Sequence, residues 1–163
     1  MVRGLGGMIG CQDKAETLAA ELAAGVEAVR QSAWRLDRRP RVYFEEWDDP
    51  LISGIQWVSE LIQVAGGDNC FEELAGMPLG RDRIIADPDE VIRRKPDIII
   101  GSLCGKKFRP ERLAERPGWA AIPAVRNGHV AQIKSAIILQ PGPAALTDGL
   151  RAIHDVVMDW ARP

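Results

Sequence analysis

Apolar and polar residues follow two kinds of pattern along this chain of 163 residues, one typical of helices and one typical of buried strands. Between Asp13 and Trp34 the apolar residues recur every three or four positions, which predicts one long helix with an alanine-rich side. Residues 41–46 predict a strand. The continuous β-branched run at 98–101 is typical of a parallel strand that is buried on both faces.

Capping and turn signals predict the other elements. Asp49 and Pro50 suit the cap and the first position of a helix that ends at residues 66–67. Asp87 and Pro88 predict a second, short helix in the same way. The remaining expected elements are a short helix at 110–116, strands at 121–125 and 129–133, and a last helix from about residue 143. This alternation indicates an α/β domain in layers with a mainly parallel sheet.

The first ten residues contain four glycines, so we expect a flexible leader at 1–10. Gly4 and Gly6 begin a pattern that resembles a dinucleotide-binding loop, but Ile9 stands where the third glycine belongs. No strand is predicted before them either, so we do not expect a dinucleotide site.

Composition and charge restrict the possible functions. Hydrophobic residues make up 46% and charged residues 27% of the chain, which is typical of one globular domain. The formal net charge is −2 and the basic runs are short, so nucleic-acid binding is not expected. Cys11, Cys70 and Cys104 are too few and too scattered for a disulfide framework or a zinc site. No export signal and no membrane-spanning run is predicted.

Two short motifs bear on catalysis. Residues 101–107 resemble half of a phosphate-binding loop, but the glycine spacing is short and Lys107 replaces the residue that would hold magnesium. Cys104 could act as a nucleophile with His129 or His154 as its base, or it could fill space as a small apolar residue, and we favour the second interpretation. We therefore expect no enzyme, no catalytic residue and no cofactor.

The junction after the first predicted strand is the strongest candidate site. Four carboxylates, Glu45, Glu46, Asp48 and Asp49, surround Trp47 at the point where the strand ends. They lack the alternating ligands of a calcium loop, so no metal site is expected. A solvated strand end and a surface that faces a ligand both remain open. The large aromatic side chain of Trp47 favours the ligand-facing surface.

Several segments together resemble the cobalamin and ferric-siderophore substrate-binding proteins of ABC transporters, and most closely the cobalamin-binding subgroup. The similar segments are residues 44–51, 57–61, 65–67, 95–97, 116–119, 124–128 and 140–143. The resemblance implies two α/β lobes joined by a long helix. Residues 11–36 would be the connecting helix and residues 40–163 the C-terminal lobe, a three-layer lobe with a mainly parallel central sheet. The N-terminal lobe would be absent.

The resemblance also implies a set of contact residues. Ligand contacts would come from loops at the carboxyl ends of the strands, at Glu46, Trp47, Ser102, Leu103 and the segment from Ala136 to Gln140. An acidic residue at the start of a helix docks such proteins onto arginines of the permease. Asp89 matches that position, and Glu90 lies beside it.

From this resemblance we expect a solute-binding component, or a fragment of one, for an importer of a cobalamin-like corrinoid or an iron siderophore. The expected partners are this small-molecule ligand and an ABC-transporter permease. The compartment would be periplasmic or cell-surface by resemblance, and cytoplasmic if the chain is made without a signal peptide. The alternative is a self-associating interaction module. In that case a homodimer would form through the face that the missing lobe leaves exposed.

Overall fold

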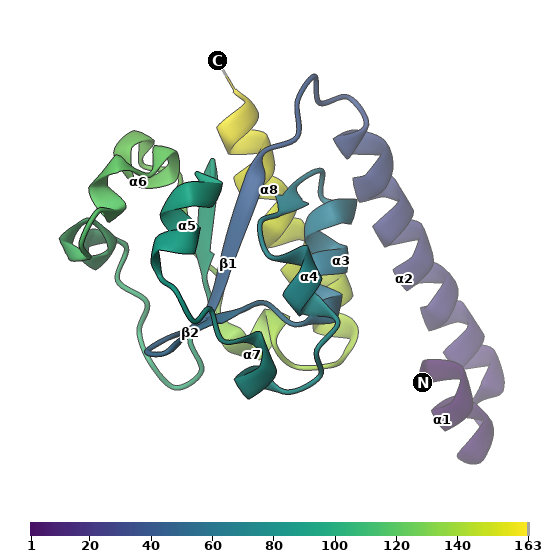
Figure 1. Cartoon of the computed structure of the whole chain (residues 1–163). Coiled ribbons are helices and arrows are strands. Elements are labelled where there is room, and N and C mark those ends of the chain that lie inside the picture. The colour runs from purple at the N-terminus through teal and green to yellow at the C-terminus, as the bar shows by residue number, and fades with distance from the viewer. Residues whose placement is uncertain (163) are drawn as a thin grey trace.

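A central sheet with helices on both faces forms the body of the molecule in the computed structural model, which describes residues 1–162 (Figure 1). The strands are β1 (Arg41–Asp48), β2 (Leu51–Ser53), β3 (Asp68–Asn69), β4 (Ile98–Gly101) and β5 (Val130–Gln132). Their order is β2-β1-β4-β5, and β3 pairs with the first residues of β1. Only β2 runs antiparallel to its neighbour, so the expected α/β fold with a mainly parallel sheet is confirmed.

The two faces of the sheet bury separate apolar clusters because successive side chains of a strand point to opposite faces. Val42 and Phe44 of β1 pack with α3 (Gln56–Val64) and α8 (Leu150–Ala161). Tyr43 packs on the other face, where α5 (Asp89–Arg94) and α6 (Pro123–Asn127) lie. The shorter elements are α4 (Glu72–Ala75), α7 (Ser135–Ile138), the 3₁₀ helices η1 (Gly80–Arg83), η2 (Pro110–Glu115) and η3 (Trp119–Ala121), and the π-helical turn η4 (Ala145–Gly149).

The predicted long helix is confirmed as α2 (Gln12–Ala33), which contacts α3, α8 and η4. Its amino-terminal part extends beyond the body of the molecule (Figure 1). The predicted flexible leader at 1–10 is wrong, because Val2–Met8 forms the helix α1, which folds back against α2. Gly6 permits this packing, since a Cβ atom there would lie 2.2 Å from the Cβ of Ala15.

Two other sequence predictions are wrong. The Asp49-Pro50 pair does not begin a helix: it forms the turn of a hairpin in which β2 returns along β1, and α3 begins only at Gln56. Residues 121–125 do not form a strand. Pro123 instead occupies the first turn of the helix α6, and the strand that follows, β5, pairs in parallel with β4.

Within residues 1–162, every helix is too short or too polar to be a candidate for crossing a lipid bilayer.

Candidate ligand-binding edge

The carboxyl ends of β1 and β4 lie at one edge of the sheet, the lower edge in Figure 1. Here β1 meets β2 with an irregular register, from Glu45 opposite Ser53 to Trp47 opposite Ile52. Glu46 is therefore the extra residue of a β-bulge, which re-aims side chains at a strand end. The bulge directs the two adjacent glutamates, Glu45 and Glu46, toward different arginines.

Glu45 has no exposed surface and is neutralised by Arg116, which follows η2. The Arg116 Nη1 and Nη2 atoms donate to the Glu45 carboxylate oxygens over 2.6 and 3.0 Å. The Tyr43 hydroxyl donates to the same carboxylate over 3.2 Å. Burial alone would lower the pKa of Arg116, but its hydrogen bonds and ion pair with Glu45 outweigh burial and raise the pKa. Arg116 also stacks over the ring of Trp119 at 4.4 Å.

Glu46 is paired with Arg83 of η1, whose side chain is only 2% exposed. The two guanidinium nitrogens donate to the carboxylate over 2.7 and 3.0 Å, and Arg83 also donates to the carbonyl oxygen of Ser53. The Nε atom of Arg83 has no hydrogen-bond partner within residues 1–162. This ion pair fixes η1 against the β1–β2 hairpin.

Trp47 lies half-buried at the end of β1, and its indole nitrogen donates to the carbonyl oxygen of Asp49 over 2.9 Å. The ammonium group of Lys106 lies 4.5 Å from the ring centroid and binds Asp48 over 2.8 Å. Burial alone would raise the pKa of Asp48, but the hydrogen bond and charge of Lys106 lower it. Lys106 thus links the loop after β4 to the end of β1.

A pocket of about 600 Å³ opens between these strand ends and η2. Its charged lining contains five cations and three carboxylates, and its apolar lining is Leu103 and Phe108. The lining residues are Glu45, Asp48, Leu103, Lys106, Lys107, Phe108, Arg109, Arg112, Glu115 and Arg116.

The structure places the predicted ligand-contact residues at the same edge but in different environments. Trp47 is half-buried there, and Leu103 lines the pocket although it is largely buried. Ser102 is fully buried, and its Oγ atom has no hydrogen-bond partner within the described part of the chain. Ala136 and Gln140 are exposed in and just after α7, which follows β5.

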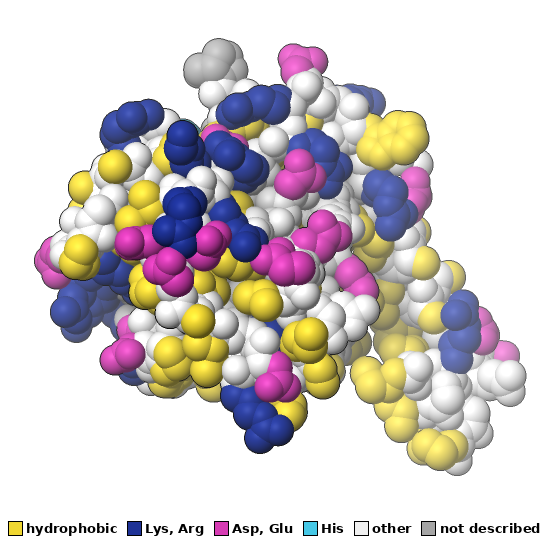
Figure 2. Space-filling view, in the orientation of Figure 1, with side chains coloured by type: hydrophobic (Ala, Val, Ile, Leu, Met, Phe, Trp, Pro, Cys, Tyr) yellow, Lys and Arg dark blue, Asp and Glu magenta, His cyan; other side chains and the backbone are white. Residues whose placement is uncertain are grey.

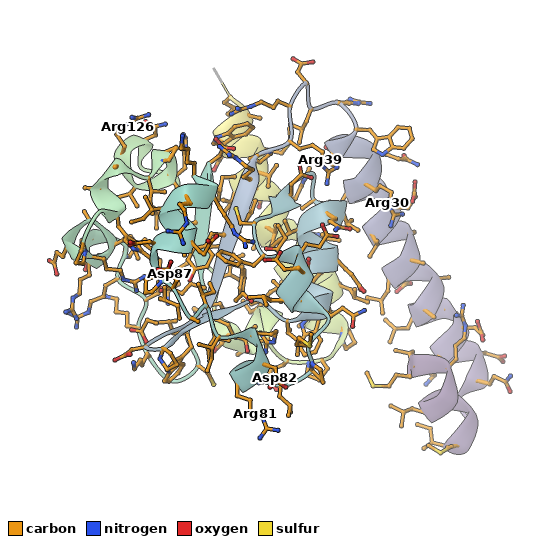
Figure 3. The ribbon with its side chains drawn as sticks, in the orientation of Figure 1. Arg30, Arg39, Arg81, Asp82, Asp87 and Arg126 are labelled. Atoms are coloured by element: carbon orange, nitrogen blue, oxygen red, sulfur yellow. The ribbon has the colours of Figure 1, made fainter. Side chains whose placement is uncertain are left out.

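The predicted docking residues lie in α5 and do not line this pocket. Asp89 is exposed at the first position of α5. Glu90 is half-buried and bonds Arg93 over 2.7 Å and Arg94 over 3.2 Å, so its charge is compensated within the helix. Asp87, which precedes this helix, lies away from the edge where Arg81 and Asp82 are found (Figure 3).

Sequence reasoning missed the cationic residues of the pocket as a group. Lys106 and Lys107 were considered only as part of an incomplete phosphate-binding loop, and Arg109, Arg112 and Arg116 were not predicted to be site residues. The available signal was a dense run of cations directly after a buried strand. Among residues 1–162, no three His, Cys, Asp or Glu side chains gather as a potential metal site.

The arrangement can be compared with known proteins. The family model described as periplasmic binding protein matches residues 1–137. A curated vitamin B12-binding protein from Vibrio parahaemolyticus is 26% identical over 122 residues, which cover 71% of this chain and 40% of that protein. The chain therefore spans less than half the length of that relative.

Solved structures share the fold. One is a possible iron-binding, periplasmic solute-binding protein from Staphylococcus epidermidis. The match covers 96% of this chain and 59% of the chain of that protein, with a TM-score of 0.80 and 20% identity. Another is a periplasmic heme-binding protein from Roseiflexus sp. The match covers 96% of this chain and 61% of the chain of that protein, with a TM-score of 0.73 and 28% identity. The chain belongs to the periplasmic binding protein family, whose members bind solutes rather than act as enzymes.

Proposed function

We propose that this chain forms one wall of the ligand cleft in an ABC importer's solute-binding protein, for a cobalamin-like corrinoid or an iron siderophore. The observation that supports this most is the pocket of about 600 Å³ at the carboxyl ends of β1 and β4. In open α/β sheets, ligands bind outside the carboxyl ends of the strands. Among the similar proteins, the one from Vibrio parahaemolyticus is a vitamin B12-binding protein and the one from Roseiflexus sp. is a heme-binding protein.

The proposed contact surface consists of Leu103, which lines this pocket, and of Trp47, Ala136 and Gln140 outside it. In this proposal Glu46 and Ser102 support the contact surface and do not touch the ligand. The Glu46 carboxylate accepts two hydrogen bonds from Arg83, and Ser102 has no exposed surface. An open wall buries less of a ligand than a closed cleft does, so we expect weak binding by this chain alone.

Tryptophan emission during titration with cyanocobalamin and with the ferric hydroxamate ferrichrome tests this proposal. We expect at least one ligand to quench emission in a saturable way. The Trp47→Ala variant should weaken that binding by about tenfold, the loss of one good aromatic contact. The control is Trp34→Ala, because Trp34 is 84% exposed and follows α2. Equal affinities in both variants would show that the site lies elsewhere.

Docking onto the permease is the second part of the proposal. Asp89 is the better candidate for a contact with permease arginines, since it has no ion pair within residues 1–162, whereas Glu90 binds two arginines of its own helix. Asp89→Lys should reduce stimulation of the transporter's ATPase, and Asp155→Lys on α8 is the control. Unchanged stimulation by Asp89→Lys would remove this docking site.

A specific observation also favours the second candidate function, self-association. Met1, Leu5, Met8, Ile9 and Leu18 are exposed at the tip made by α1 and the first turns of α2. Figure 2 shows this gathering of hydrophobic side chains at the lower right. Exposed apolar patches tend to find partners, and a second copy would cover both tips in a homodimer.

Light scattering across a concentration series tests this alternative. We expect a dimer that the double variant Leu5→Glu, Met8→Glu converts to a monomer. The Met77→Glu variant is the control, because Met77 is exposed between α4 and η1, outside the tip. A monomeric wild type at high concentration would contradict self-association.

A further inference from the structure

The pocket at the carboxyl ends of β1 and β4 carries a surplus of positive charge that the rest of the chain does not share. Its lining has two more cations than carboxylates, whereas the whole chain has a formal net charge of −2. A local concentration of one charge sign in a hollow raises the local concentration of ligands with the opposite sign.

The carboxylates of the pocket are already engaged. Glu45 pairs with Arg116, Asp48 pairs with Lys106, and Glu115 lies 3.5 Å from Arg112. Lys107 and Arg109 have no carboxylate partner within residues 1–162, and both side chains are exposed. The surplus charge is therefore located on these two side chains.

The backbone that carries the two cations is anchored on both sides. Phe108, which lies between them, is 2% exposed and packs against Gly101. A Cβ atom at Gly101 would lie 2.1 Å from the Phe108 ring, so this close contact requires glycine. Lys106 is held by Asp48, and Arg116 is held by Glu45. Anchoring of this kind reduces the entropy that a ligand must remove when it orders the loop.

From this geometry we propose that the ligand is an anionic chelate, whose acidic groups bind Lys107 and Arg109 while its body covers Leu103 and Trp47. The inference rests on the proposed function and narrows its ligand class. Arg109 can bind a carboxylate, phenolate or phosphate through two parallel hydrogen bonds, and Lys107 acts as a point charge. An uncharged corrinoid or an uncharged trihydroxamate chelate would leave both cations without a counter-charge.

The test compares two ferric chelates that differ in charge. Ferric enterobactin is a trianionic tris-catecholate complex, and ferrichrome is a neutral trihydroxamate complex. We expect the full chain to bind ferric enterobactin more tightly, with an affinity that falls as the NaCl concentration rises from about 50 to about 500 mM. The double variant Lys107→Gln, Arg109→Gln should lower the affinity for ferric enterobactin by about tenfold or more. It should change the affinity for ferrichrome by less than about twofold.

The control removes the same total charge elsewhere. Arg35 and Arg126 are exposed and have no ion pair among the described residues, and Arg126 lies at the end of the molecule opposite Arg81 (Figure 3). The variant Arg35→Gln, Arg126→Gln should bind ferric enterobactin as the wild type does. An equal loss in both double variants would show a general charge effect and overturn the inference.

The remaining outcomes separate the two proposals. If cyanocobalamin or ferrichrome binds as tightly as ferric enterobactin and the Lys107→Gln, Arg109→Gln variant binds all ligands as the wild type does, the anionic-ligand inference is wrong and the proposed function stands. If none of the three ligands binds at low salt, the proposed function fails, and the inference fails with it.

Discussion

Two adjacent glutamates at the end of β1 are neutralised by arginines, but the two ion pairs have opposite orientations. In the Glu45–Arg116 pair the carboxylate is fully buried, and the arginine side chain is 26% exposed and lines the pocket. In the Glu46–Arg83 pair the arginine is 2% exposed and the glutamate side chain is 22% exposed.

The difference shows how one strand end can present a cation on one side and a carboxylate on the other. The Glu45–Arg116 pair ties the segment after η2 to β1, and Arg116 lines the same pocket as the cations Lys107 and Arg109. The Glu46–Arg83 pair seals η1 against the hairpin. In our proposal the ligand therefore binds on the pocket side, and the Glu46 side has a supporting role.

Removal of Arg116 should have the largest effect on stability. The Arg116→Met variant leaves the Glu45 carboxylate buried without its cation, which should lower the free energy of unfolding by about 3–5 kcal/mol. Denaturant unfolding followed by circular dichroism measures this loss. The double variant Glu45→Leu, Arg116→Met is the control and should recover most of the lost stability. A loss below about 1 kcal/mol in the single variant would contradict the burial of this pair.

Glu46→Gln should lower the free energy of unfolding by less, about 1–3 kcal/mol, because Arg83 keeps its hydrogen bond to the Ser53 carbonyl oxygen. The same unfolding measurement applies. Because Glu46 supports the fold and does not bind the ligand in this account, affinity for ferric enterobactin measured on the folded variant should stay within about twofold of the wild type. A tenfold loss of affinity without loss of stability would instead make Glu46 a ligand contact.

Tyr43 distinguishes the two ion pairs at high pH, because its hydroxyl donates to Glu45 and not to Glu46. Burial, together with the charge of Glu45, raises the pKa of Tyr43 well above its ordinary value. The folded state therefore holds this proton more tightly than the unfolded state does. The stability that depends on it is complete below the ordinary pKa of about 10 and is lost as the pH rises above that value.

The free energy of unfolding of the Tyr43→Phe variant should be about 1 kcal/mol below that of the wild type at pH 7. From about pH 10 upward it should decline less than that of the wild type. Unfolding free energies measured across this range give both quantities. Parallel declines in the two proteins would show that Tyr43 is not the group that titrates.

The smallest expected effect belongs to Asp48 and Lys106, a more exposed pair at the same strand end. Lys106 lowers the pKa of Asp48, so the stabilisation is present above the ordinary pKa and is lost as the pH falls through the lowered pKa. Lys106→Met should lower the free energy of unfolding by less than about 1 kcal/mol at pH 7, and this difference from the wild type should disappear in acid. A difference that persists in acid would show that Lys106 acts through packing on Trp47 instead.

The sequence could predict those parts of the fold in which neighbouring residues determine the outcome. The long helix α2 follows from its apolar spacing, and β4 follows from three consecutive isoleucines, Ile98, Ile99 and Ile100. The Asp49-Pro50 pair does not by itself predict one structure, because the same residues suit a helix start and a hairpin turn. Pairing of β2 with β1 decided between them, and local sequence does not contain that information.

The charge pattern of the site could not be predicted for a related reason. The carboxylates around Trp47 suggested an acidic surface, but their arginines come from positions 37 and 71 residues further along the chain. Only the folded chain brings Arg83 and Arg116 to Glu46 and Glu45. The strand-end position of the candidate site could be read from the sequence, whereas the positive charge of its pocket could not.

Backbone amide NMR of the full chain with the diamagnetic gallium complex of enterobactin can show on which side of the β1 end the ligand binds. We predict the largest chemical-shift changes at residues 103–109 and at Arg116, with little change at Arg83 and in η1. Changes concentrated in η1 and β2, with residues 103–109 unaffected, would contradict the assignment of the pocket side as the ligand-binding wall.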